Sequence, residues 1–196
     1  VLAGRSRVAQ SPVARPREVG LDVRYPLTNE LTIDVTANTD FAQAEADEQQ
    51  VNLDRFPLFF PERRRFFQEG SGIFDFTMAA NARLFHSRRI GLTPDLRPVP
   101  VLGGARVVGR LGGWDVGLLD MQTEAAHGQR SANSGVLRLR RQVLNAGSTV
   151  GGMVTSFVDR GRTNTAVAAD AVVRPFGDTF VTLKVASTFD RGDSAG

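Results

Sequence analysis

The chain has 196 residues, 41% of them hydrophobic and 8% aromatic, so it can form one folded domain rather than a disordered chain. Its formal net charge is +3, and because acidic residues are spread among the arginines, no concentrated basic stripe predicts binding to nucleic acid. It has no cysteine, which excludes disulfides, zinc–thiolate sites and cysteine nucleophiles, and no apolar run long enough for a transmembrane helix.

The first predicted elements are two strands joined by a tight turn, within residues 21–41. In LDVRYPL (21–27) and ELTIDVTANTDF (30–41), hydrophobic and polar side chains alternate at every second position. Leu31, Ile33 and Val35 therefore share one face of the second strand, and polar residues occupy the other. A period of two over this length is typical of a strand with one apolar and one polar face. The preceding residues, 1–18, are rich in proline and arginine and predict a strand end and a loop. Since Val1 is not a start methionine, we expect a piece of a longer protein.

The pattern changes over residues 42–91. Asp40 can cap a short helix through FAQAEADEQQ, where alanine, glutamate and glutamine favour helix. The stretch FPLFFPERRRFFQEG (56–70) follows, with five phenylalanines and three consecutive arginines. Its two prolines exclude a regular helix or a central strand across its start. We expect this region to be an irregular segment rich in arginine and phenylalanine.

Alternation returns and persists over residues 104–190. Strands are predicted on both sides of a tight turn at Gly112-Gly113, and then over 134–144, 148–159, 165–176 and 179–190, with RGRTN (160–164) as one of the turns. Together with the first hairpin, the chain has about eight strands in successive antiparallel hairpins. Two architectures fit this spacing, a soluble β-sandwich and a β-barrel.

Strand length and face chemistry bear on that choice. Several strands reach the roughly 9–11 residues that a tilted strand needs to cross a bilayer. Aromatic residues lie near strand ends, where membrane barrels place interfacial girdles: Tyr25, Trp114, Phe180 and Phe189. A sandwich with one face in solvent shows the same alternation, however, so the pattern leaves both architectures open.

The region from residue 31 to residue 91 resembles the DUF5916 family. The family pattern runs close to DFSQVEAD, then VNL-RF-LFFPEKRPFFLEG, then SRRIG. The chain has DFAQAEAD at 40–47, VNLDRFPLFFPERRRFFQEG at 51–70 and SRRIG at 87–91. Ala42 and Ala44 replace serine and valine, and Arg65 stands where proline is usual, which adds charge and removes a backbone constraint.

The resemblance implies a fold, a location and partners. In this family a carbohydrate-binding module resembling family 9 commonly precedes a predicted outer-membrane β-barrel. We therefore expect an all-β protein, an antiparallel up-and-down β-barrel fragment with a short helical and irregular inward segment. The partial barrel would span 1–196, with a hairpin at 21–41, the inward segment at 42–91 and consecutive hairpins at 104–190. The implied location is the bacterial outer membrane, with outer-membrane lipid as partner and glycan bound through an N-terminal module absent from this chain.

We further expect the inward segment to narrow the lumen as a plug. Arginines pair well with carboxylates, and phenylalanines would pack beneath or between these ion pairs. The candidate lumen ion-pair residues are Asp40, Glu45, Asp47, Arg55, Glu62, Arg63, Arg64, Glu69, Arg88 and Arg89. The candidate aromatic packing residues are Phe56, Phe59, Phe60, Phe66 and Phe67.

Other functions remain open from sequence. One is a soluble secreted β-domain accessory to a glycan-active enzyme. Another is a glycosidase site, which needs two carboxylates about 5–10 Å apart, such as Glu62 and Glu69. His86 and His127 have no partner at metal-ligand spacing, and no loop has EF-hand spacing. The sequence therefore predicts no cofactor, no metal and no catalytic residue, and favours a protein that is not itself an enzyme.

Overall fold

The computed structural model describes residues 20–39, 62–78, 82–93 and 97–192. The strands are β1 (Leu21–Pro26), β2 (Leu31–Thr39), β3 (Val101–Leu111), β4 (Trp114–Thr123), β5 (Ala132–Gln142), β6 (Thr149–Asp159), β7 (Arg162–Val173) and β8 (Val181–Gly192). The helical turns are α1 (Arg65–Gln68), η2 (Ser71–Phe74) and η4 (Ser87–Arg89). Within the described part of the chain, no helix is long and apolar enough to span a membrane. The expected strand end at 1–18 and helix at 41–50 lie outside the described residues.

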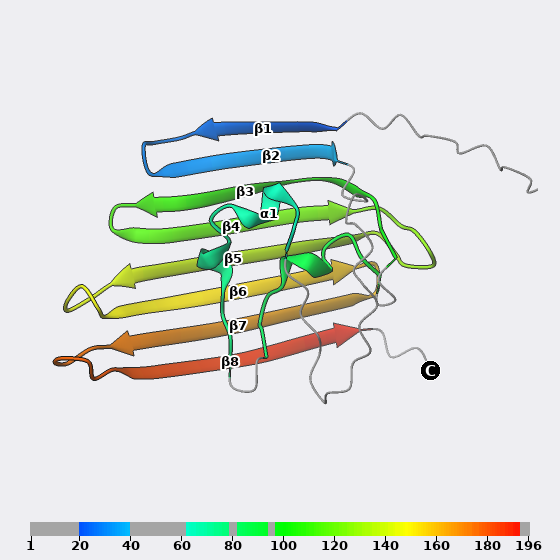
Figure 1. Cartoon of the computed structure of the whole chain (residues 1–196). Helices are drawn as coiled ribbons and strands as arrows, with labels where there is room; N and C mark the ends of the chain where they lie inside the picture. Colours follow the sequence, from blue (N-terminus) through cyan, green and yellow to red (C-terminus); the bar gives the residue numbers. More distant parts are fainter. Residues whose placement is uncertain (1–19, 40–61, 79–81, 94–96, 193–196) are drawn as a thin grey trace, which may run out of the picture.

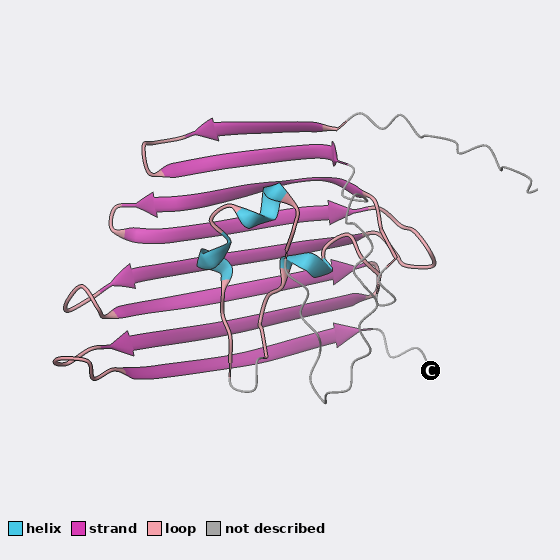
Figure 2. Cartoon of the chain, viewed as in Figure 1, coloured by secondary structure: helices cyan, strands magenta, loops and turns pink. Residues whose placement is uncertain are grey.

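All eight strands form one antiparallel sheet in which each strand pairs with its neighbours in sequence, in the order β1 to β8 (Figure 1). The predicted all-β, up-and-down antiparallel fold is therefore confirmed. The sheet is open, because β1 and β8 are its two edges and do not pair with each other. Figure 2 shows that the strand axes are closely aligned across the whole sheet, with successive arrows pointing in opposite directions and the helical turns on one side.

Two turns show how local sequence sets the hairpins. Gly112 and Gly113 both have positive φ, 55° and 83°, which the favoured two-residue hairpin turn requires at both positions. The turn after β6 is shorter than the predicted RGRTN, since β7 already begins at Arg162. Asp159 explains the difference: its Oδ1 accepts hydrogen bonds from the backbone N–H groups of Gly161 and Arg162, at 3.0 and 2.9 Å, and reverses the chain early.

The register defines the two faces of the sheet. One row of directly opposed residues is Arg24, Asp34, Arg106, Leu119, Val136, Thr155, Ala166 and Thr188. The adjacent row, which points the other way because strand side chains alternate, is Tyr25, Ile33, Val107, Leu118, Leu137, Val154, Val167 and Ser187. The first row belongs to what we call the inner face, and the second to the outer face.

Between β2 and β3, the described residues 62–78, 82–93 and 97–100 lie across the inner face, and we call them the covering segment (Figure 1). Its phenylalanines pack on side chains of the sheet, and together they form the hydrophobic core. The segment contributes Phe67, Phe74, Phe76 and Ile90, and the sheet contributes Val101, Leu119, Met121, Val136, Met153 and Ala168. Gly117 of β4 gives η2 the space for this contact, since a Cβ there would lie 2.8 Å from both Ile73 and Phe74 side chains.

The outer face has no cover among the described residues. Leu118 is 43% exposed whereas its neighbour Leu119, on the inner face, is 1% exposed. Val154 and Met153 show the same contrast, at 39% and 1%. The exposed large hydrophobic residues of the outer face include Leu21, Val23, Tyr25, Val35, Leu137, Leu139, Val150, Val158, Val167, Leu183, Val185 and Phe189. The described residues thus place a core on one side of the sheet and leave an apolar surface uncovered on the other.

Candidate functional site

The candidate site is the contact between the covering segment and the charged part of the inner face. Glu62, at the start of the described segment, is held from several directions. Its carboxylate accepts hydrogen bonds from Arg64 Nε and Nη2, both at 2.8 Å, and from Ser87 Oγ at 2.8 Å. Arg64 also donates to the carbonyl oxygens of Ser87 and Ile90, at 2.8 and 2.7 Å. These bonds join two parts of the segment that are more than twenty residues apart.

Burial and charge set the ionisation of this cluster. Burial alone would raise the pKa of Glu62, but hydrogen bonds and the charge of Arg64, with the bond from Ser87, outweigh it, so the pKa is lowered. Burial is also the main cause that lowers the pKa of His86, and the positive charge of Arg83 adds to it. Near neutral pH the cluster therefore combines an ionised carboxylate with a neutral imidazole.

Arginines stack on the phenylalanines of the segment. The rings of Phe66 and Phe67 meet edge to face, with centroids 5.1 Å apart. The Arg64 guanidinium lies 4.3 Å from the Phe67 ring centre, and that of Arg106 lies 5.1 Å from Phe66. Such contacts contribute about 2 kcal/mol or more when the cation is desolvated. Arg64 of the segment and Arg106 of β3 thus form, with these two rings, a layer that is both apolar and charged.

Arg106 of β3, whose side chain is 1% exposed, binds the segment to the sheet. Its Nη2 donates to Asp34 Oδ2 at 2.6 Å and its Nη1 to the backbone carbonyl of Glu69 at 2.6 Å. Arg24, from β1, donates from Nε to the other Asp34 oxygen at 2.6 Å. Its Nη1 and Nη2 donate to the two carboxylate oxygens of Glu69. The segment is therefore bound at Glu69 to both β1 and β3, and Asp34 of β2 joins the two arginines that bind it.

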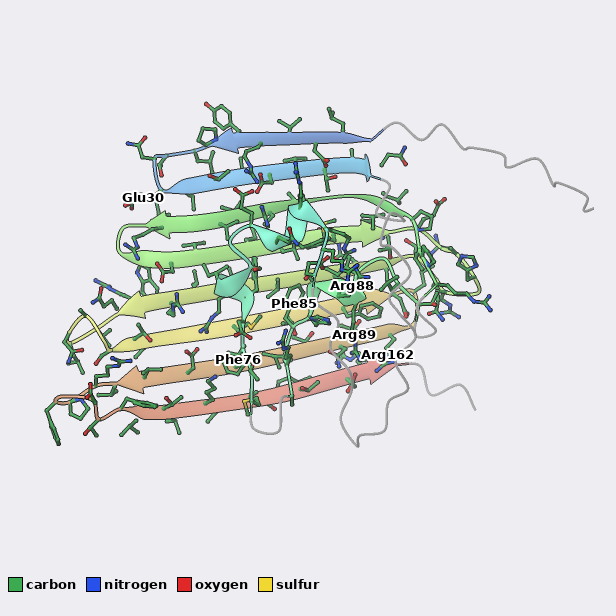
Figure 3. The ribbon with its side chains drawn as sticks, in the orientation of Figure 1. Glu30, Phe76, Phe85, Arg88, Arg89 and Arg162 are labelled. Carbon is green, nitrogen blue, oxygen red and sulfur yellow. The ribbon has the colours of Figure 1, made fainter. Side chains whose placement is uncertain are left out.

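The segment is also bound at the far side of the sheet. Lys184 of β8 donates from Nζ to the carbonyl of Thr77 at 2.8 Å and lies 5.6 Å from the ring centre of Phe76. Arg138 of β5, which is paired with buried Asp170 at 2.5 Å, lies 5.5 Å from the same ring. Figure 3 shows Phe76 and Phe85 on the segment where it crosses the sheet. Polar contacts to the segment thus extend from one edge strand to the other.

The structure describes some of the candidate residues and leaves others outside the described ranges. Asp40, Glu45, Asp47, Arg55, Phe56, Phe59 and Phe60 lie outside the described residues. Glu62 pairs with Arg64 as described, while Glu69 pairs with Arg24, which was not among the candidates. Arg88 is buried in η4, and Arg63 and Arg89 are exposed (Figure 3 labels Arg88 and Arg89).

The sequence did not predict that Arg24, Asp34 and Arg106, from β1, β2 and β3, form a cluster. Their signal was present, because each stands on the polar side of an alternating strand. What could not be seen was the register that puts Arg24, Asp34 and Arg106 directly opposite one another.

The arrangement favours binding or blocking over catalysis. Glu62 and Glu69, the carboxylates considered for glycoside hydrolysis, are each hydrogen-bonded to an arginine. A carboxylate whose pKa is lowered in this way, as at Glu62, is a poor general acid. Among the residues that the structure describes, no three His, Asp or Glu side chains lie together as metal ligands would.

Two cavities border the segment. One, of about 580 Å³, lies against the inner face of β1 to β5 and is lined mainly by charged residues. The other, of about 470 Å³, is lined by aromatic and polar residues of the segment, among them Phe67, Phe74, Phe85 and His86.

A comparison with family models finds one match, to a family described as "Domain of unknown function (DUF5916)", over residues 5–103. The match covers about half of the chain, including the first hairpin and the covering segment. No curated protein and no solved structure matches the chain.

Proposed function

Because the chain belongs to the DUF5916 family, whose description assigns no activity, we propose from the structure that its sheet is part of the wall of an outer-membrane β-barrel. The covering segment lies on the lumen side of this wall. The protein then acts in envelope transport or in surface handling of carbohydrate-linked substrates. Glycan recognition is supplied by the family-9-like module that the resemblance implies.

The observation that carries the proposal is the division of the sheet into a bare apolar face and a covered charged face. Water-soluble monomers rarely expose contiguous apolar patches larger than a few hundred Å², and larger ones mark contact with lipid or protein. Here exposed leucine, valine and aromatic side chains occupy the outer face from β1 to β8. Lipid covers such a face without needing any further element of the protein.

The inner face supports the same conclusion. Membrane barrels place polar residues toward a wet lumen, where irregular backbone is also tolerated because water and protein satisfy its hydrogen bonds. The inner face carries the ion pairs of Asp34 and Asp170, and the irregular chain of the covering segment lies on it. Strands β3 to β8 are 10–12 residues long, which suits a tilted crossing of the bilayer.

The absence of cysteine provides a direct test of the two faces. Val154 and Thr155 are adjacent in β6 but point to opposite faces. We expect a spin label on Val154→Cys, in protein reconstituted in lipid vesicles, to be accessible to oxygen and shielded from a water-soluble nickel chelate. A label on Thr155→Cys is the matched control and should not show lipid exposure. The proposal is wrong if the protein stays in the aqueous fraction without detergent, or if the Val154→Cys label meets the chelate as freely as a label in a loop.

The plugging role of the segment is tested separately. In planar bilayers, replacing residues 65–78 with a glycine–serine linker of equal length should raise the conductance of the protein. The control is a glycine–serine linker of equal length in place of the turn 174–180 (at the opposite end of the hairpins from the segment's entry), which should leave conductance unchanged. Equal conductance of the native and segment-replaced proteins would show that the segment does not narrow a pore.

A further inference from the structure

The charged cavity of about 580 Å³ has the size of a small-molecule site. It lies between the inner face of the sheet and the Glu69–Ile73 turn of the covering segment. Glu30, which also lines it, marks the end of the sheet at which β1 and β2 are joined, in Figure 3. The cavity is therefore next to the segment but on the open part of the inner face.

Four arginines line this cavity in two groups that are built alike. Arg24 and Arg106 share the carboxylate of Asp34, each binding one of its oxygens at 2.6 Å. Arg110 and Arg140 share the carboxylate of Asp115 in the same way. Two guanidinium cations and one shared aspartate give each group a net charge of +1.

The second group is the more open to solvent. Arg110 and Arg140 bind opposite oxygens of Asp115, both at 3.1 Å, and their side chains are 57% and 39% exposed. Each uses only its Nε and one terminal nitrogen for this carboxylate, which leaves N–H groups of a five-donor guanidinium directed elsewhere.

A carboxylate of the protein itself occupies the first group. Glu69 binds Arg24 through both of its oxygens, in the two-pronged geometry that arginine favours for carboxylates. Both side chains are exposed, at 50% for Arg24 and 62% for Glu69, so the pair contributes little stability and can exchange. With Glu69 and Glu30 present, the four arginines are balanced by four acids; when Glu69 leaves, the cavity gains one positive charge.

We propose that this cavity binds a small hydroxylated carboxylic acid, whose carboxylate displaces Glu69 from Arg24. The ligand restores charge balance, and the exposed N–H groups of Arg110 and Arg140 are donors for its hydroxyl oxygens. Displacement also releases the segment from β1, while Arg106 retains the Glu69 carbonyl. Binding of the acid therefore loosens one attachment of the covering segment.

The inference deepens the proposed function by naming a ligand chemistry, and it rests on that function only for the ligand's passage through the wall. Binding is measured on the detergent-solubilised full protein by calorimetry at low salt. The probe is D-glucuronate, with D-glucose as the neutral probe of the same ring size. We expect glucuronate to bind and glucose to bind at least ten-fold more weakly. Equal affinity for the two sugars, or no binding of glucuronate, overturns the proposal.

Variants separate displacement from general attraction to a basic protein. Glu69→Gln removes the internal competitor and should tighten glucuronate binding about five-fold, the equivalent of about 1 kcal/mol for an exposed ion pair. Arg24→Gln should weaken binding ten-fold or more. Arg162→Gln is the matched control: Arg162 pairs with an exposed aspartate at the opposite end of the sheet from Glu30 (Figure 3) and should leave the affinity unchanged.

Hydrogen exchange provides a readout that does not depend on affinity. Glucuronate should speed exchange of the Ile73 amide, which is bonded to the Gly70 carbonyl next to Glu69, in the native protein. In Glu69→Gln it should have no such effect. The proposal fails if Glu69→Gln does not change affinity, or if Arg162→Gln weakens binding as much as Arg24→Gln. A protein that binds glucuronate but needs no detergent would refute the membrane assignment and leave this site standing.

Discussion

Replacing Arg106 with glutamine should weaken the attachment of the covering segment while leaving the sheet paired. Arg106 is almost fully buried and makes three hydrogen bonds: two to Asp34, at 2.6 and 3.2 Å, and one to the Glu69 carbonyl at 2.6 Å. Removing one member of a buried ion pair costs about 3–5 kcal/mol, because the other charge stays buried without its partner. Asp34 keeps Arg24, so we expect the low end of that range, about 3 kcal/mol.

The double variant Asp34→Asn, Arg106→Gln isolates the electrostatic part of this loss. It removes the buried carboxylate together with its partner, so it should be less destabilised than Arg106→Gln alone. The assay is urea unfolding of the protein in detergent, with hydrogen exchange of the Ile73 amide as the report on the segment. A loss below about 0.5 kcal/mol for Arg106→Gln, which is the range of ordinary surface substitutions, would refute the reasoning. So would a double variant at least as unstable as Arg106→Gln alone.

Three further predictions concern other parts of the protein. In Gly117→Val, the new Cβ would lie 2.8 Å from the Phe74 ring, so the substitution should displace η2 and make it sensitive to protease. The same substitution at Gly152, on the outer face, is the control and should not affect η2. The pKa of Glu62 is lowered, so its contribution to stability is full above the unfolded pKa of about 4.3 and is lost as pH falls through the folded pKa. Protection of the segment should therefore fall as the pH is lowered below about 4.3, and Glu62→Gln should abolish that dependence. Leu137→Arg on the outer face should reduce stability in lipid by about 2–4 kcal/mol if it lies near the bilayer midplane, and an unchanged unfolding midpoint would contradict a lipid-facing wall.

The strands could be predicted because their information is local. Alternation of apolar and polar residues is visible within each strand, and Gly112-Gly113 sets a turn that needs positive φ at both positions. Strand ends were less certain, since β7 begins three residues before the predicted start at Thr165. There the decisive contacts come from the carboxylate of Asp159, which the alternation of neighbouring residues does not reveal.

The site was less predictable because its partners are distant in sequence. Glu62 and Arg64 are two residues apart and could be proposed as a pair from the sequence. Glu69 binds Arg24, 45 residues away, and Asp34 binds Arg106, 72 residues away. Both pairs depend on the register of β1 to β3, which one sequence does not contain.

The connectivity of the sheet has a consequence for the order of folding. From β3 to β8 each strand joins its partner through a short connection, whereas β2 and β3 are separated by residues 40–100. Compared with a two-residue turn, closing a loop of about 60 residues involves about five doublings of length, an added entropy cost of about 3 kcal/mol. Hairpins from β3 onward should therefore assemble first, and the β1–β2 hairpin should add last, once the covering segment has packed on the sheet.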